Sequence, residues 1–141
     1  MHLDQTMPTV KGPAERFTGD VYVDTINPRR EGSKMIVARV HFTPCARTDW
    51  HSHAHGQTLH ITEGVALLGT RDGQVIVAHP GDTIYTLPGE EHWHGASPTD
   101  FMTHLAMLEG ADDGTDGTTW LEKVTDEQYD AASNAGLACS R

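Results

Sequence analysis

The chain has 141 residues, enough for one domain with a sizeable core, and we expect a single domain spanning residues 1–141. It carries 20 acidic and 10 basic residues, and the resulting net charge of -10 disfavours contact with nucleic acid phosphates and anionic membranes. No stretch approaches the about 18 consecutive apolar residues of a membrane span, and the first residues lack the cationic start and apolar run of a secretory signal. These features predict a cytoplasmic protein that acts on a small molecule and binds neither nucleic acid nor membrane.

The N-terminal residues 1–16 are polar and show little periodicity, so we expect an arm that lies across the domain or across a partner subunit. Short β-prone runs then recur, separated by turn signals such as Asp72-Gly73 and Pro88-Gly89. The predicted strands cover residues 20–25, 35–42, 57–63, 64–68, 74–78, 83–87, 91–96 and 101–108. This spacing is typical of an antiparallel sandwich or barrel, and a jelly roll is the architecture that protects its strand edges.

After the last predicted strand the chain changes character. Residues 110–119 are acidic and polar and are interpreted as a flexible surface loop, because their spacing does not match a calcium-binding EF-hand. Thr125-Asp126-Glu127-Gln128 resembles a capping box that starts a short helix through about Ala132. Residues 133–141 are expected to form a frayed tail.

Cys45 and Cys139 fit neither a disulfide framework nor a Cys-x-x-Cys motif. We therefore expect two free thiols, one semi-buried and one in the tail.

The distribution of histidines carries the functional information. Alternate residues of a strand share one face, so His51 and His53 can reach the same ion, and His92 starts a second His-x-His far enough away to lie on a facing strand. Gly56 permits a bend, after which Gln57 can add an amide oxygen. The pattern predicts a metal site with His51, His53 and His92 as ligands. Ordinary packing or surface roles are kept for His2, His41, His55, His60 and His79.

Two motifs resemble those of the cupin superfamily. His51-Ser52-His53, then Gln57 and Gly64, is similar to the first cupin motif, with Cys45 at its usual initial Gly and Gln57 at its usual Glu. Its second motif is matched by the set Gly81, Gly89 and His92, although Leu87 stands where Pro is usual and Ala96 replaces the frequent terminal Asn. The resemblance implies an all-β cupin jelly-roll barrel, here with a short C-terminal helix.

A narrower resemblance extends from about Lys11 to Tyr129. Segments such as Gly56-Gln57-Thr58-Leu59 and His92-Trp93-His94-Gly95 are similar to small bacterial cupins that include manganese-dependent hydroxynitrile lyases. This resemblance implies the metal ligands His51, His53, Gln57 and His92 and the catalytic histidines His94 and His104. By resemblance and by strand parity, it also implies an apolar substrate pocket formed by Ala38, Val40 and Leu108.

Physical reasoning supports the two additional histidines. His94 shares the face of His92, and an imidazole near a metal can take or give a proton at neutral pH, although such a histidine can also merely orient a ligand. The function that the resemblance implies is cleavage of a cyanohydrin to an aldehyde and HCN, and the reverse addition.

Alternatives remain at this stage. A metal-dependent dioxygenase or oxidoreductase could use the same scaffold, as could a noncatalytic cupin that binds a small ligand. Three nitrogen donors and one oxygen donor suit Mn(II), and also Fe(II), Co(II) or Ni(II), with Zn(II) less well matched. Small cupins commonly pair, so a homodimer or homotetramer is expected.

Overall fold

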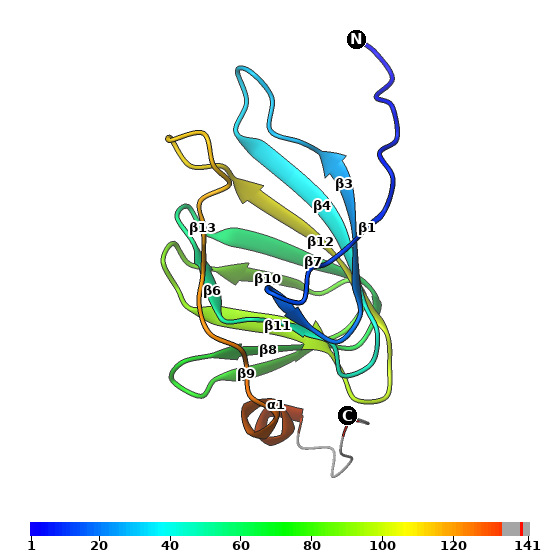
Figure 1. Ribbon diagram of the computed structural model, residues 1–141, viewed down its shortest axis with the longest axis vertical. Helices are drawn as coiled ribbons and strands as arrows, with labels where there is room; N and C mark the ends of the chain where they lie inside the picture. Colours follow the sequence, from blue (N-terminus) through cyan, green and yellow to red (C-terminus); the bar gives the residue numbers. More distant parts are fainter. Residues whose placement is uncertain (134–138, 140–141) are drawn as a thin grey trace.

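The structure, a computed structural model, describes residues 1–133 and residue 139. Two curled antiparallel sheets face each other and form the barrel, with a helix against the outer surface of one of them (Figure 1). The strands of the first sheet, in spatial order, are β1 (Val10–Lys11), β3 (Val21–Asn27), β4 (Met35–Phe42), β12 (Met102–Glu109), β7 (Gln57–Gly64) and β10 (Thr83–Thr86).

The second sheet has the order β13 (Thr118–Trp120), β6 (His51–His53), β11 (His92–Ala96), β5 (Arg47–Thr48) and β2 (Phe17–Thr18). Strand β8 (Ala66–Thr70) also pairs with β11, and β9 (Val75–Ala78) pairs with β8. The all-β jelly-roll prediction is confirmed. Each of the eight predicted strands overlaps an observed one. The short strands β1, β2, β5 and β13 were not predicted, and β6 was expected only as the extended segment that holds His51 and His53.

Inward-facing side chains of the two sheets form the main core. In β7, Leu59 and Ile61 alternate with more exposed residues, and they meet Val40 and Phe42 of β4 between the sheets. This period-two alternation is what a strand with one buried face requires. The core occupies part of the barrel, and the histidines occupy the interior beside it.

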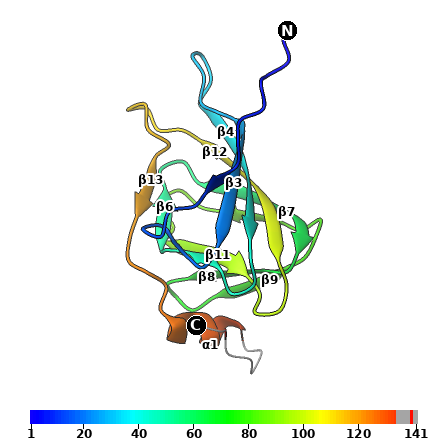
Figure 2. The same cartoon turned by 45° about the vertical axis from the view of Figure 1, so that its right-hand side comes forward.

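A second cluster lies on the outer surface of the second sheet. Trp50 and Trp93, whose parity is opposite to that of the neighbouring histidines, pack there with Val124 and Tyr129. Tyr129 and Ala132 of helix α1 (Asp126–Ser133) pack in this cluster, and Figure 2 shows the helix below β8 and β9. The two tryptophans are thus packing residues.

The start of α1 has the predicted capping box. Thr125 Oγ1 accepts a hydrogen bond from the Gln128 amide at 3.1 Å, and Gln128 Oε1 accepts one from the Thr125 amide at 2.9 Å. These reciprocal bonds satisfy two donors at the helix start. The helix has eight residues, and the described part of the chain contains no helix long and apolar enough to cross a membrane.

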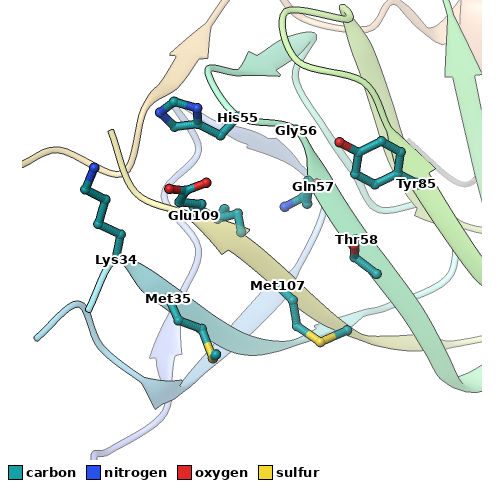
Figure 3. A pocket seen from close by; sticks show the side chains of 10 residues that line it. Lys34, Met35, His55, Gly56, Gln57, Thr58, Tyr85, Met107 and Glu109 are labelled. Carbon is teal, nitrogen blue, oxygen red and sulfur yellow. The ribbon is translucent and has the colours of Figure 1, made fainter. Parts of the chain in front are cut away.

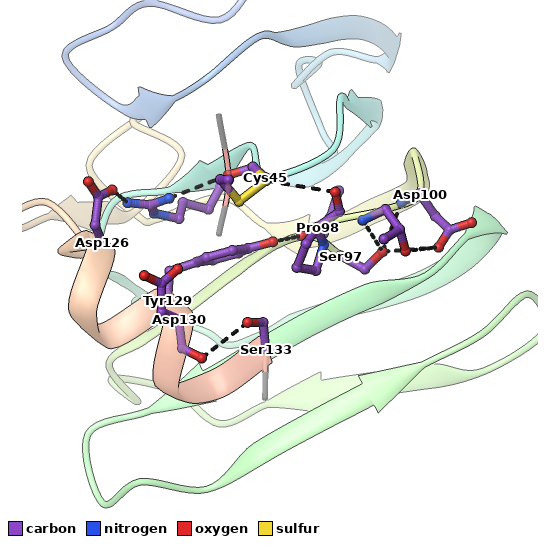
Figure 4. The surroundings of a disulfide bond; sticks show 12 residues. Cys45, Ser97, Pro98, Asp100, Asp126, Tyr129, Asp130 and Ser133 are labelled. Carbon is purple, nitrogen blue, oxygen red and sulfur yellow. Dashed lines mark hydrogen bonds and ion pairs between the residues drawn. A yellow bond between two sulfur atoms is a disulfide. The ribbon is translucent and has the colours of Figure 1, made fainter. Parts of the chain in front are cut away.

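The expectation of two free thiols is wrong. Cys45 and Cys139 form a disulfide, with their Cα atoms 5.8 Å apart (Figure 4). Sequence spacing could not reveal the pair, because 94 residues separate the two cysteines and only the folded chain brings them together. Residues 134–138 and 140–141 of the expected frayed tail lie outside the described residues, while Ser133 belongs to α1.

The other two expected segments are located as follows. The residues that precede β1 extend away from the barrel (Figure 1). Within this N-terminal arm, Asp4 forms an ion pair with Arg30. The acidic segment is a loop up to Gly117, where β13 begins. Arg29, in the connection between β3 and β4, holds this loop in place, because its guanidinium donates hydrogen bonds to the carbonyls of Ala111 and Thr115.

Candidate metal centre

Neighbouring strands bring the three predicted histidine ligands together. His51 and His53 alternate along β6, and His92 of β11 is the cross-strand partner of His51. Their ring centroids are 4.3 to 5.4 Å apart, and one nitrogen from each ring lies within 4.8 Å of the others. Each of the three residues is at most 4% exposed. Within the described residues, this is a group that could hold a metal ion.

Gln57 reaches the same interior from the opposite sheet. It is the first residue of β7, directly after Gly56, whose φ of 79° lies in the left-handed region that glycine adopts readily. A side chain at position 56 would also meet the Thr86 carbonyl oxygen at 2.7 Å from its Cβ atom. The predicted bend at Gly56 is therefore present, and the Gln57 side chain is buried.

Hydrogen bonds fix the orientation of each histidine ring. The Nδ1 atom of His51 lies 2.9 Å from the Asp49 carbonyl, and that of His92 lies 2.9 Å from the Glu90 carbonyl. Because a carbonyl only accepts, each Nδ1 carries the proton and each Nε2 keeps its lone pair. His53 Nδ1 instead lies 3.0 Å from the Thr118 hydroxyl.

The metal-facing atoms have no other partner. Among the described residues, the Nε2 atoms of His53 and His92 and the Oε1 atom of Gln57 are buried without a hydrogen bond. Buried polar atoms are almost always paired, and three unpaired acceptors around one space are what a bound cation would satisfy. The residues present therefore fit a divalent metal ion.

Burial lowers the pKa values of His51, His53 and His92 and so favours their neutral forms. Burial, followed by repulsion from His92 and His53, holds the pKa of His51 well below its usual 6.5. Burial and repulsion from His92 lower the pKa of His53 to about 4, and burial also lowers the pKa of His92. All three imidazoles are neutral at pH 7, the form that binds a metal ion.

A second histidine pair lies against this group. His94 Nδ1 and His104 Nε2 are 3.0 Å apart, joining β11 to β12 across the barrel, and both side chains are buried. The His94 ring centroid is 5.1 Å from that of His51, and Phe42 packs against both rings of the pair. Burial, then repulsion from His104, holds the pKa of His94 well below its usual value, and burial lowers the pKa of His104 to about 4.

The three residues predicted to form the substrate pocket lie on the inner face of the first sheet. Val40 of β4 is opposite His104, Ala38 is opposite Ala106, and Leu108 is opposite Gln57. Val40 thus adjoins the histidine pair, and Leu108 adjoins Gln57.

A hollow of about 540 Å³ opens at the barrel rim beside Gln57 (Figure 3). Leu108, Met35 and Met107 contribute apolar surface, and Lys34 and Glu109 lie toward one end of it. Gln57 and Leu108 are the predicted site residues that border this hollow.

Sequence reasoning missed two residues that contact the ligand histidines. Thr118 orients His53, and the Trp120 ring lies over His51 with 4.8 Å between ring centroids. Both lie in β13, which pairs with β6. The alternation of Thr118 and Trp120 was the available signal, and it was obscured because Thr118 was assigned to the acidic loop.

Comparison with known proteins agrees with this fold and centre. The cupin domain model matches residues 38–107. An (R)-mandelonitrile lyase from Granulicella tundricola is 47% identical over 119 residues, covering 84% of this chain and 89% of that protein. The chain therefore belongs to the cupin family, and its three-histidine group indicates a divalent metal.

Solved structures give the same result. A cupin-like protein from Thermotoga maritima matches with a TM-score of 0.83 and 34% identity, over 89% of this chain and 93% of that one. A cupin 2 conserved barrel domain protein from Rhodopseudomonas palustris matches with a TM-score of 0.67 at 17% identity, over 83% of this chain and 78% of that one, which is a likeness of fold alone.

Proposed function

We propose that this cupin is a metal-dependent hydroxynitrile lyase, which cleaves a cyanohydrin to an aldehyde and HCN and catalyses the reverse addition. The observation that carries the proposal is the placement of the buried His94–His104 pair directly beside a ligand set of three histidines and Gln57. The 47% identity to an (R)-mandelonitrile lyase supports it.

The ligand set explains why a lyase is favoured over an oxygenase. Oxygenases that use Fe(II) often combine two histidines with one carboxylate, whereas His51, His53, Gln57 and His92 are all neutral. A divalent ion held by them would keep its full formal charge of +2 and would favour negative charge on a nearby substrate oxygen.

The chain's own residues then handle the proton. His94 and His104 are neutral at pH 7, so the pair can accept the hydroxyl proton of the cyanohydrin. As the carbon–carbon bond breaks, its electron pair leaves with cyanide and the carbinol carbon becomes a carbonyl. The protonated imidazole returns its proton to cyanide, giving HCN and the neutral pair. Val40, which lies opposite His104, together with Ala38 and Leu108, bounds the apolar side of this space.

We propose Mn(II) as the native ion, and Fe(II), Co(II), Ni(II) and Zn(II) are the alternatives that metal analysis distinguishes. The assembly is proposed to be a homodimer or homotetramer. A cytoplasmic location is also proposed, and the oxidation state of Cys45 and Cys139 in cells tests it, because disulfides are rare in that compartment.

The deciding experiment combines metal analysis of the purified protein with a mandelonitrile cleavage assay under nitrogen. Benzaldehyde release that proceeds without oxygen, stops on chelation and returns with metal supports the lyase. Oxygen consumption with a diketone, flavonol or alkene substrate, and no benzaldehyde release, would identify an oxygenase. Binding without turnover would identify a noncatalytic module.

A further inference from the structure

A second cavity lies on the other flank of the candidate metal centre. It has a volume of about 180 Å³ and lies where β8 and β9 of one sheet face β10 of the other. Leu68, Ile76 and Ile84 provide hydrocarbon walls, and His92 lines one side of it. None of the pocket residues predicted from sequence belongs to it.

Strand register shows how close this cavity is to the ligands. Thr86 and Thr70, which line it, are the cross-strand partners of Gln57 and His92. Leu108 pairs with Gln57 from the opposite side. The cavity and the predicted wall on β4 and β12 therefore lie on opposite sides of Gln57.

The size and lining of the cavity indicate what it holds. A dry cavity of about 150 Å³ lined by leucine, isoleucine and phenylalanine is large enough to bind benzene. The cavity beside His92 is slightly larger, and its inner-facing residues Leu68, Ile76 and Ile84 have no polar side-chain atoms. Its polar side chains include Gln74, Glu90 and Thr70.

We infer that this cavity binds the nonpolar substituent of the substrate, an aromatic ring or a branched alkyl group of about benzene's size. The inference rests on the proposed function, because it assumes that the substrate's oxygen lies at the metal centre. It assigns Ile76, Ile84 and Leu68 as the residues that select the substituent, while Ala38 and Val40 bound the reacting end of the substrate beside His104.

The location is tested without turnover by methyl NMR of the Zn(II)-loaded protein, because paramagnetic Mn(II) would broaden nearby signals, with benzyl alcohol as the probe. An aromatic ring in the cavity shifts the methyl signals of Leu68, Ile76 and Ile84 through its ring current. Saturable shifts of these methyl groups, with those of Val40 unchanged, support the inference. Shifts confined to Val40 and Leu108, or no saturable shifts, overturn it.

Substrate selectivity is tested by filling the cavity from β9. Ile76 is partly buried and lines the cavity, whereas Val77 next to it is 53% exposed, so Val77→Phe is the matched control for Ile76→Phe. Ile76→Phe should raise the KM for mandelonitrile about tenfold or more, because the ring loses its apolar site. The KM for the cyanohydrin of acetaldehyde, which carries only a methyl group, should change less than about twofold.

Equal effects of Ile76→Phe on the two substrates, or equal effects of the two phenylalanine variants, would overturn the assignment. Failure of the proposed lyase function is recognised separately. In that case the protein would cleave neither cyanohydrin, and only the NMR titration would decide whether the cavity binds an aromatic group.

Discussion

The hydroxyl of Thr118 lies 3.0 Å from Nδ1 of His53, and it is the side-chain group that orients this ligand histidine. His51 and His92 are oriented by backbone carbonyls, which no substitution removes. Thr118 lies in β13, beside β6, and its own amide donates to the Asp116 carboxylate at 2.9 Å. The acidic loop thus fixes the residue that sets the ring angle of His53.

Thr118→Val should lower the affinity for the divalent metal about 10- to 100-fold, because valine keeps the shape of threonine but cannot accept the proton of Nδ1. Thr118→Ser should retain most of the affinity. Thr119→Val, at the exposed neighbouring position of β13, is the control. The measurement is metal affinity by competition with a chelator. If Thr118→Val and Thr119→Val bound metal equally well, the hydrogen bond would have no orienting role.

Substitutions in the two groups of histidines should have different effects, on metal binding in one group and on turnover in the other. His51→Ala or His92→Ala should abolish metal binding, since each removes a nitrogen from the central group. His104→Ala should leave metal content unchanged and lower kcat for cyanohydrin cleavage about 100-fold or more, the usual contribution of a proton-transfer group. His104→Gln, which is closer in size, controls for the cavity left by alanine. Full activity of both His104 variants would contradict the proton-transfer role.

Local signals predicted much of the fold. The run 35–42 was predicted with the bounds that β4 has, because its alternation of apolar residues is strong and it is not interrupted by turn residues. The helix start was found because a capping box is a local motif. The two-residue strands β1, β2 and β5 could not be predicted, because they are too short to show a period and depend on their partners.

Some residues of the candidate site were likewise predicted from local patterns, whereas others depend on contacts between distant strands. Alternation correctly predicted that His51 and His53 share one face. His92 joins them from β11, the neighbouring strand of the same sheet, and not from a strand that faces them as expected. The contact between Thr118 and His53 joins residues 65 positions apart, so it depends on the pairing of β13 with β6 and not on a local pattern. The cavity formed by β8, β9 and β10 likewise exists only where the sheets curl toward each other.

Acid should destabilise the metal-free protein between pH 6.5 and about 4. Burial lowers the folded-state pKa of His53 and His104 to about 4, and it also lowers the pKa of His51, His92 and His94. Within this window the unfolded chain binds protons that the folded chain does not, so the free energy of unfolding decreases as pH falls. The slope is about 1.4 kcal/mol per pH unit for each such histidine.

Urea unfolding of the metal-free protein at pH 7, 6 and 5 measures this slope. His104→Phe should reduce it by the contribution of one histidine, whereas His55→Gln, at an exposed position, should leave it unchanged. Both variants lack one histidine, so comparing their slopes cancels the effect of the change in overall charge. An identical slope for His104→Phe and the parent protein would show that His104 is not buried as a neutral group.

Cys45 combines two opposing effects on stability. Its φ of 72° lies in the left-handed region, which costs a residue with a side chain about 1 to 2 kcal/mol. The cupin motif usually has glycine at this position, where that cost disappears. The disulfide to Cys139 offsets it, because a cross-link across 94 residues restricts the unfolded chain and is worth about 2 to 4 kcal/mol.

Cys45→Gly and Cys139→Ser both remove the disulfide, but only the first relieves the backbone. Each should therefore be less stable than the oxidised parent protein, by about 1 to 4 kcal/mol, with Cys45→Gly the more stable of the two by about 1 kcal/mol. Under reducing conditions Cys45→Gly should exceed the parent protein as well, so the order of stability reverses with redox state. Denaturant unfolding with and without reductant measures these differences. Equal stability of the two variants in both conditions would show that the backbone at position 45 carries no conformational cost, leaving the disulfide as the reason for cysteine at a glycine position.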